Sequence, residues 1–140
     1  MSHLLKKSNG NLENVDVIEL VMPFKADFVS VSRLTASGIA SRAGFDIDSI
    51  EDIKVTVSEV CSKIVERGSM TAKQYKIIFC VSDEEIRIVF DCEDKSIKCI
   101  FDQSDDGLSI SIIKALMDKV ELCPNNDYIL SMSKTFKEKF

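Results

Sequence analysis

Apolar and polar residues alternate in five short stretches of the chain, and this period of two predicts β-strands. The expected strands cover residues 14–22, 74–81, 86–91, 120–123 and 128–132. Polar turns at 82–85 and 124–127 indicate that the middle two strands and the last two strands form hairpins. Pro23 ends the first strand, which favours a place near an edge of the sheet.

Apolar residues recur at steps of three or four in three other segments, which predicts helices over 26–43, 48–68 and 108–117. The recurring apolar positions of the first helix are Phe28, Val31, Leu34, Ala36, Ile39 and Ala43. In the second helix Asp48 is the expected N-cap, Glu51 completes an acidic form of the capping box, and Gly68 ends the helix.

The order of these elements is strand, helix, helix, two strands, loop, helix, two strands. This order indicates a two-layer α/β sandwich, with helices packed on one face of a mixed, mostly antiparallel sheet. Residues 1–13 are expected to form a flexible N-terminal arm before a single domain of residues 14–140. The loop at 93–106 is either an ordered strand or a mobile lid, and part of it is expected to be poorly ordered without a ligand.

Composition narrows the classes of function. With 45% hydrophobic residues the chain can bury a core, and its net charge of −5 argues against a general nucleic-acid binder. The chain shows no apolar run long enough to span a membrane and no signal-peptide core, which indicates a cytoplasmic protein. Its five cysteines have no Cys-x-x-Cys spacing and His3 is its single histidine, so no metal site is expected.

Two consecutive segments carry a resemblance to a known family. The runs at 32–44 (SRLTASGIASRAG) and 50–59 (IEDIKVTVSE), with 115–120 (ALMDKV), closely resemble the anti-sigma-factor serine kinases of the RsbW type. These proteins belong to the histidine-kinase-like ATPase superfamily, and the resemblance covers roughly residues 17–136. It implies that fold, a cytoplasmic homodimer, and a role in transcription regulation during stress response or sporulation. It also implies two protein partners, a sigma factor and an anti-anti-sigma factor that such kinases phosphorylate on serine with Mg-ATP.

The first part of the site that this resemblance implies lies on the second helix, in the pattern Ser-Glu-x-x-x-Asn. Its glutamate is Glu59, which would act as the general base on the attacking hydroxyl. The asparagine that would bind magnesium is replaced by Lys63, and an ammonium group has no lone pair for a metal ion. Glu59 and Lys63 can form an ordinary i,i+4 surface ion pair, or Lys63 can occupy the vacated metal position and neutralise Glu59 and neighbouring carboxylates. A mixture of the two is expected.

The other two parts of the implied nucleotide site are also altered. The family has an Asp-x-Gly-x-Gly box where this chain has Cys-Glu-Asp-Lys-Ser, so Cys92 replaces the adenine-binding aspartate, and Asp94 and Ser96 replace the two glycines. In the glycine-rich turn that would receive phosphate only Gly107 remains, where it serves equally well as the start of a helix. Asp105 and Asp106, just before it, would repel a polyphosphate.

These differences favour a pseudokinase that binds a sigma factor, its antagonist, or both, without a cofactor. The alternative is an active serine kinase that uses Mg-ATP, with Glu59 as the base. A third possibility is an adaptor of the same fold in another signalling pathway. Arg33 matches a partner-facing arginine of the family, and its other interpretation is an ordinary solvated helix residue.

Overall fold

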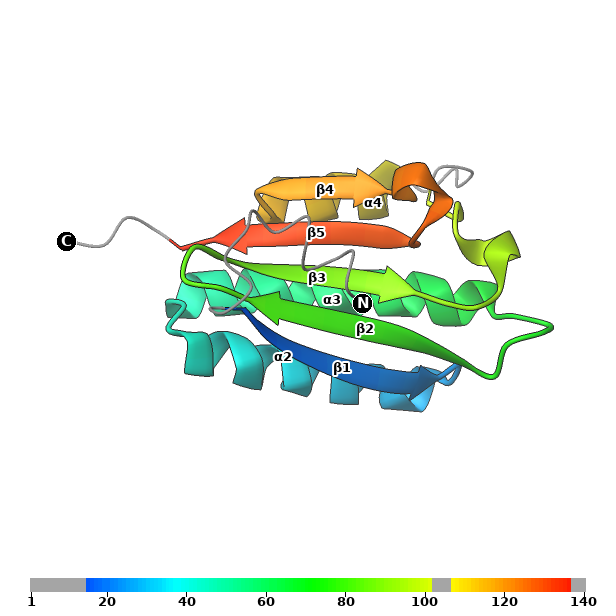
Figure 1. Cartoon of the computed structure of the whole chain (residues 1–140), viewed down its shortest axis with the longest axis horizontal. Helices are drawn as coiled ribbons and strands as arrows, with labels where there is room; N and C mark the ends of the chain where they lie inside the picture. Colours follow the sequence, from blue (N-terminus) through cyan, green and yellow to red (C-terminus); the bar gives the residue numbers. More distant parts are fainter. Residues whose placement is uncertain (1–14, 102–106, 137–140) are drawn as a thin grey trace.

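A five-stranded antiparallel sheet organises the computed structural model, which describes residues 15–101 and 107–136 (Figure 1). The strand order is β1-β2-β3-β5-β4, and each described pairing is antiparallel. The strands are β1 (Asp16–Pro23), β2 (Gln74–Val81), β3 (Glu85–Asp91), β4 (Lys119–Leu122) and β5 (Leu130–Thr135). The expected edge position of β1 is confirmed, and the expected N-terminal arm lies outside the described residues.

The helices α2 (Val29–Ala43), α3 (Ile47–Arg67) and α4 (Gly107–Leu116) lie against one face of the sheet (Figure 1). The described residues also form the short 3-10 helices η2 (Ala26–Phe28), η3 (Lys95–Ile97) and η4 (Pro124–Asn126). The predicted two-layer α/β sandwich is therefore confirmed. In the described ranges, no helix combines the length and the apolar character needed to cross a bilayer.

Alternation along the strands separates two apolar clusters. Ile77, Phe79, Ile88 and Phe90 point to the helical layer and belong to the main core. Ile78, Cys80 and Val89 form part of a smaller cluster on the opposite face of the sheet. Because neighbouring residues of a strand point to opposite faces, this register decides which side of the sheet each polar residue of β3 can reach.

The start of α3 differs from the sequence prediction. Asp46, not Asp48, is the N-cap, and its Oδ1 accepts a hydrogen bond from the backbone N–H of Ser49 at 2.8 Å. Asp46 has the extended backbone that a capping residue needs, whereas Asp48 already lies in the first helical turn. Glu51 forms an ion pair with Lys54 at 3.1 Å, so the expected Asp48–Glu51 capping box is wrong.

The packing of α2 also differs from the expected apolar face. Its buried residues are Ser32, Ala36 and Ala40, which are small and let the helix pack closely. Of the expected apolar positions, Ala36 is buried and Ile39 and Ala43 pack against the core. Phe28, Val31 and Leu34 are exposed instead, Leu34 to 69%. The helix ends as expected at Gly44, whose φ of 101° is in the left-handed region.

The first part of the segment after β3 packs against the core. Residues 93–101 contain the 3-10 turn η3, and Ile97, Ile100 and Phe101 are buried in the main core. Lys98 Nζ donates a hydrogen bond to the Asp127 carbonyl at 2.9 Å, which joins this segment to the turn before β5. Residues 93–101 therefore form no strand and pack into the core, and the expectation that part of the loop is poorly ordered stays a prediction for its remaining residues. Residues 102–106 lie outside the described part.

Candidate functional site

Helix α3 carries the polar ridge on which the expected catalytic residue lies. Asp52, Thr56, Glu59 and Lys63 follow at steps of three or four, so they share one side of the helix. Thr56 is buried, and its hydroxyl donates within the helix to the carbonyls of Asp52 and Ile53, at 3.1 and 3.0 Å. Asp52 and Glu59 make contacts beyond α3, and these contacts define the site.

Glu59 is held by a residue from α4. The Ser109 hydroxyl donates a hydrogen bond to Glu59 Oε2 at 3.1 Å, across 50 positions of sequence. Ser109 is itself buried, and it belongs to the first turn of α4. The expected general base is therefore a hydrogen-bond acceptor in the contact between α3 and α4. Sequence reasoning did not single out Ser109, although a serine stands there where the family has a glycine.

Asp52 anchors the other end of α4. Its Oδ2 accepts from Lys134 Nζ of β5 at 3.1 Å, and the same ammonium donates to the Leu116 carbonyl at the end of α4. A cation that satisfies the last carbonyls of a helix stabilises its C-terminus. Helix α4 is thus attached to α3 near both of its ends, directly at Ser109 and through Lys134 at Leu116. Lys134 was also missed in the sequence, because it is 82 positions from Asp52.

Lys63 lies one turn beyond Glu59 on α3 and is half-buried. Its ammonium can donate hydrogen bonds and neutralise carboxylates, but it cannot coordinate a cation. Within the described ranges, no group of three or more His, Cys, Asp or Glu side chains could hold a metal ion.

Cys92 follows β3 and turns its side chain into the main core, where it is 4% exposed. Its thiol lies 3.6 Å from the Gln74 carbonyl, and burial raises its pKa. Asp91, the preceding residue, lies opposite Lys76 in the sheet register and forms an ion pair with Lys98 at 3.4 Å. Asp91 cannot substitute for the missing adenine-binding aspartate, because it points to the other face of the sheet.

Asp94 is occupied by local contacts. Its Oδ2 accepts a hydrogen bond from the Ser69 hydroxyl, and its Oδ1 accepts from the backbone N–H of Ser96 at 2.9 Å. These bonds, led by that from Ser69, lower the pKa of the Asp94 carboxyl to about 2. Asp94 therefore joins the loop after α3 to the start of η3. Gly107 is the exposed first residue of α4, which agrees with its interpretation as a helix start.

Arg33 lies exposed on α2, away from the α3–α4 contact residues. Its guanidinium forms no ion pair with the described residues. Val31 and Leu34 beside it are also exposed, so this part of α2 presents a cation among apolar side chains. Such a surface is suited to contact with another protein.

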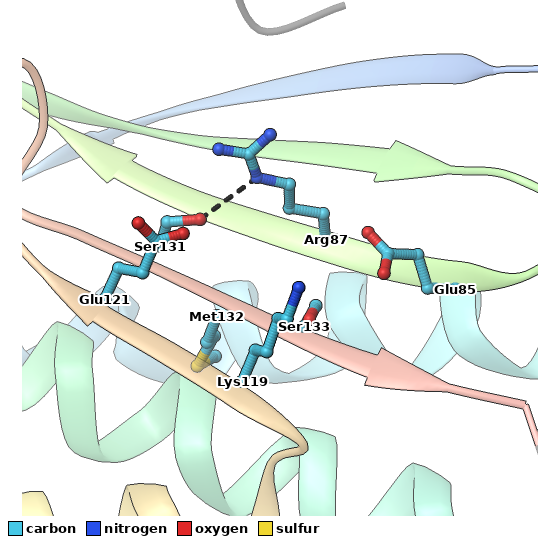
Figure 2. A pocket seen from close by; sticks show the side chains of 7 residues that line it. All are labelled: Glu85, Arg87, Lys119, Glu121, Ser131, Met132 and Ser133. Atoms are coloured by element: carbon cyan, nitrogen blue, oxygen red, sulfur yellow. Dashed lines mark hydrogen bonds between the residues drawn. The ribbon is translucent and has the colours of Figure 1, made fainter. Parts of the chain in front are cut away.

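A polar hollow of about 350 Å³ lies on the face of the sheet opposite the helices (Figure 2). Arg87 of β3 reaches over it and donates from Nε to the Ser131 hydroxyl of β5 at 3.1 Å. Lys119 and Glu121 of β4 point to the same side (Figure 2). The hollow contains charges of both signs and lies away from Glu59, so it forms no part of the site on α3.

Comparison with known proteins supports the resemblance seen in the sequence. Residues 22–134 match the family described as histidine kinase-like ATPase domain. The chain is 33% identical to the serine-protein kinase RsbW of Halalkalibacterium halodurans, covering 85% of this chain and 83% of that protein. It is 30% identical to the RsbW of Bacillus pumilus, covering 87% of each. The RsbW of Bacillus cereus strain AH187 is 44% identical over 57 residues, which is 41% of this chain.

Proposed function

This chain belongs to the RsbW-type family of histidine kinase-like ATPases, and from that premise we propose that it is a cytoplasmic regulator that binds a sigma factor, its anti-anti-sigma antagonist, or both, without transferring phosphate. Its relatives are named serine-protein kinases. We therefore propose the same kinds of partner that the family resemblance implies, but no transfer of phosphate from ATP to the antagonist.

The state of Glu59 carries this proposal. In the family resemblance this residue would accept the proton of the attacking hydroxyl, which requires its carboxylate to face the substrate. Here Ser109 donates to one of its two oxygens, Oε2, and so ties the carboxylate to the helix that would receive the phosphates. Lys63 follows on the same side of α3 and offers no lone pair to a magnesium ion. We infer that these residues do not fit Mg-ATP.

The adenine side of the site supports the same inference. Cys92 is buried with its thiol beside the Gln74 carbonyl, and a thiol is a weak acceptor for an adenine amino group. Asp94 is already bound to Ser69 and Ser96. Ile97 and Phe101 of the following segment fill the core.

The partner surface that we propose is the exposed part of α2 around Arg33. An arginine flanked by exposed apolar residues can be buried against a partner and donate hydrogen bonds to its carboxylates. The partner to test is the sigma factor or antagonist encoded in the same genome. Arg33→Glu should weaken the binding of that partner tenfold or more, which corresponds to roughly 1.4 kcal/mol. A homodimer is also proposed, on the family resemblance, and sedimentation of the purified protein tests it.

The test of the proposal is thermal unfolding of the purified protein with millimolar Mg-ATP or Mg-ADP. A ligand at about one hundred times its dissociation constant adds roughly 2.7 kcal/mol to the free energy of unfolding, which moves the melting temperature by several degrees. We expect no shift with either nucleotide. A clear upward shift would favour the second candidate function, an active serine kinase, which rests on the retention of Glu59.

A further inference from the structure

The polar hollow on the face of the sheet opposite the helices has a floor of small residues (Figure 2). Strand β5 lies between β3 and β4, and it places Ser131 and Ser133 on this face. An inner strand favours β-branched or aromatic side chains, as β3 has at Val89 on the same face. The two serines leave a hollow of about 350 Å³, which is within the size range of small-molecule sites.

The strand register places charged side chains on both sides of this floor. Arg87 of β3, Ser133 of β5 and Lys119 of β4 are direct cross-strand neighbours. Adjacent strands are about 4.8 Å apart, so the Cα atoms of Arg87 and Lys119 are about 10 Å apart and both side chains can reach one small ligand. Glu121 lies two residues further along β4, and Glu85 lies two residues before Arg87 on β3.

The side chains around the hollow retain unused hydrogen-bonding groups. Among the described residues, no ion pair forms between the four charged side chains of the hollow. Arg87 uses its Nε for Ser131, which leaves the two terminal NH₂ groups of its guanidinium for a ligand. Ser133 is only 5% exposed, and within the described ranges its hydroxyl makes no hydrogen bond. A buried hydroxyl without a partner costs free energy, which a bound molecule would recover.

The charges around the hollow define the class of ligand. Its two cations and two carboxylates cancel, so it attracts no ion of one sign. Glu85 and Glu121 would repel a polyphosphate, and Arg87 and Lys119 would repel a metal ion. An apolar molecule would remove water from these charges and give them no partner in return. The matching ligand is therefore small and carries one positive and one negative group.

We propose that this hollow binds a free α-amino acid. The carboxylate of the ligand would lie between Arg87 and Lys119 and accept from the Ser133 hydroxyl. Its ammonium group would donate to Glu121. A guanidinium suits this role, because it can bind a carboxylate through two parallel hydrogen bonds. Glu85, at the other end of the hollow, would favour an amino acid with a basic side chain over one with an acidic side chain.

The probes are the twenty free amino acids, each added at millimolar concentration and screened by thermal unfolding. We expect at least one to raise the melting temperature, and basic amino acids to raise it more than acidic ones. Titration calorimetry then compares the tightest ligand with two of its derivatives. The Nα-acetyl derivative lacks the α-ammonium charge, and the amide lacks the carboxylate charge. Each derivative should bind about tenfold more weakly or worse, because each loses one of the two proposed contacts.

Two lysines on the same face of the sheet provide matched variants. Lys119→Met removes a cation from the hollow and should weaken amino-acid binding about tenfold or more. Lys76→Met removes a cation that does not line the hollow and that pairs with Glu19, so it should change binding by no more than about twofold.

Ser133→Val tests the floor of the hollow. It removes the hydroxyl and fills space, and it should weaken binding about tenfold or more. Its melting temperature without ligand should be at or above that of the parent, because valine is the better strand former. This measurement separates lost binding from lost folding.

The proposal is wrong if none of the amino acids raises the melting temperature, or if Lys119→Met and Lys76→Met affect binding equally. Equal binding of the Nα-acetyl derivative, or of inorganic phosphate, would also overturn it, because an anion alone would then be sufficient. These measurements use neither a sigma factor nor a nucleotide, so their failure can be told apart from failure of the proposed function.

Discussion

At the scale of single residues, the carboxylate of Asp94 joins two loops that are 25 positions apart in sequence. Ser69 donates to it, and the same hydroxyl accepts from the backbone N–H of Ala72 at 2.9 Å. The ionised carboxylate therefore organises the loop before β2 as well as the start of η3. An acid with this role makes stability depend on pH.

We expect the Asp94 contribution to stability to be lost in acid. The folded-state pKa of about 2 is below the ordinary value of about 3.9, so this contribution is present above about pH 4 and disappears as the pH falls to about 2. Melting temperatures of the parent and of Asp94→Asn should therefore converge over this range. A difference that stays constant down to pH 2 would contradict this. Ser69→Ala should raise the pKa of Asp94, which carboxyl NMR titration measures.

The cysteines should separate into two classes of reactivity. Cys61, Cys80 and Cys92 are buried, and burial raises the pKa of each thiol. Cys99 and Cys123 are only half-buried. A colorimetric thiol reagent at neutral pH should modify the latter two first, and the other three only on unfolding, because the thiolate is the reactive form. Mass spectrometry identifies the labelled positions, and equal labelling of all five would refute the assignment.

At the scale of elements, a few polar groups stabilise the start of α3 and join α4 to α3. Asp46 caps α3, while Ser109 and Lys134 connect α4 to α3 near its two ends. These contacts place the expected catalytic helix and the following helix in one fixed arrangement.

Asp46→Ala should destabilise the protein more than Asp48→Ala. The first change removes the acceptor for the Ser49 amide, at a cost of about 1 kcal/mol. The second removes only a favourable charge from the first helical turn, which at an exposed site contributes about 0.3–1 kcal/mol to the free energy of unfolding. Urea unfolding measures both, and the reverse order would restore the capping box that the sequence indicated.

Lys134→Met should destabilise the protein by about 1–2 kcal/mol, because it leaves Asp52 and the Leu116 carbonyl without their donor. The matched control is Lys54→Met, which breaks the exposed ion pair with Glu51 and should cost at most about 0.5 kcal/mol. A double-mutant cycle of Lys134→Met with Asp52→Asn gives the coupling energy. Equal effects of the two lysine changes would show that Lys134 does not anchor α4.

At the scale of the whole molecule, the residues to which we attribute the loss of nucleotide binding lie on or beside three different elements. Lys63 lies on α3, Cys92 follows β3, and Ser109 lies on α4. A single reversion should therefore be insufficient.

We expect the triple variant Lys63→Asn, Cys92→Asp, Ser109→Gly to gain a nucleotide response that Lys63→Asn alone lacks. The new carboxylate would be buried at a position that is 4% exposed, so the free variant should melt several degrees below the parent. Mg-ADP should then raise its melting temperature. A response of equal size in the single variant would show that Lys63 alone prevents binding.

Much of the architecture could be predicted from local pattern. Period-two alternation located the strands, and the edge position of β1 followed from Pro23, because these signals depend on neighbours in sequence. The buried side of α2 was predicted only in part. Ala36, Ile39 and Ala43 face the core as expected, but Phe28, Val31 and Leu34 are exposed, and the small residues Ser32 and Ala40 are buried instead.

The sequence by itself determined the two-layer fold, the family, and the loss of the usual residue types at Lys63 and Cys92. These are statements about residue identity and spacing, which need no knowledge of distant contacts. Only the tertiary structure decided that Glu59 is bound by Ser109, that Asp94 is bound by Ser69, and that Ile97, Ile100 and Phe101 enter the core. Each of these joins segments far apart in the chain, and a hydrogen bond depends on a separation in space that no local pattern encodes.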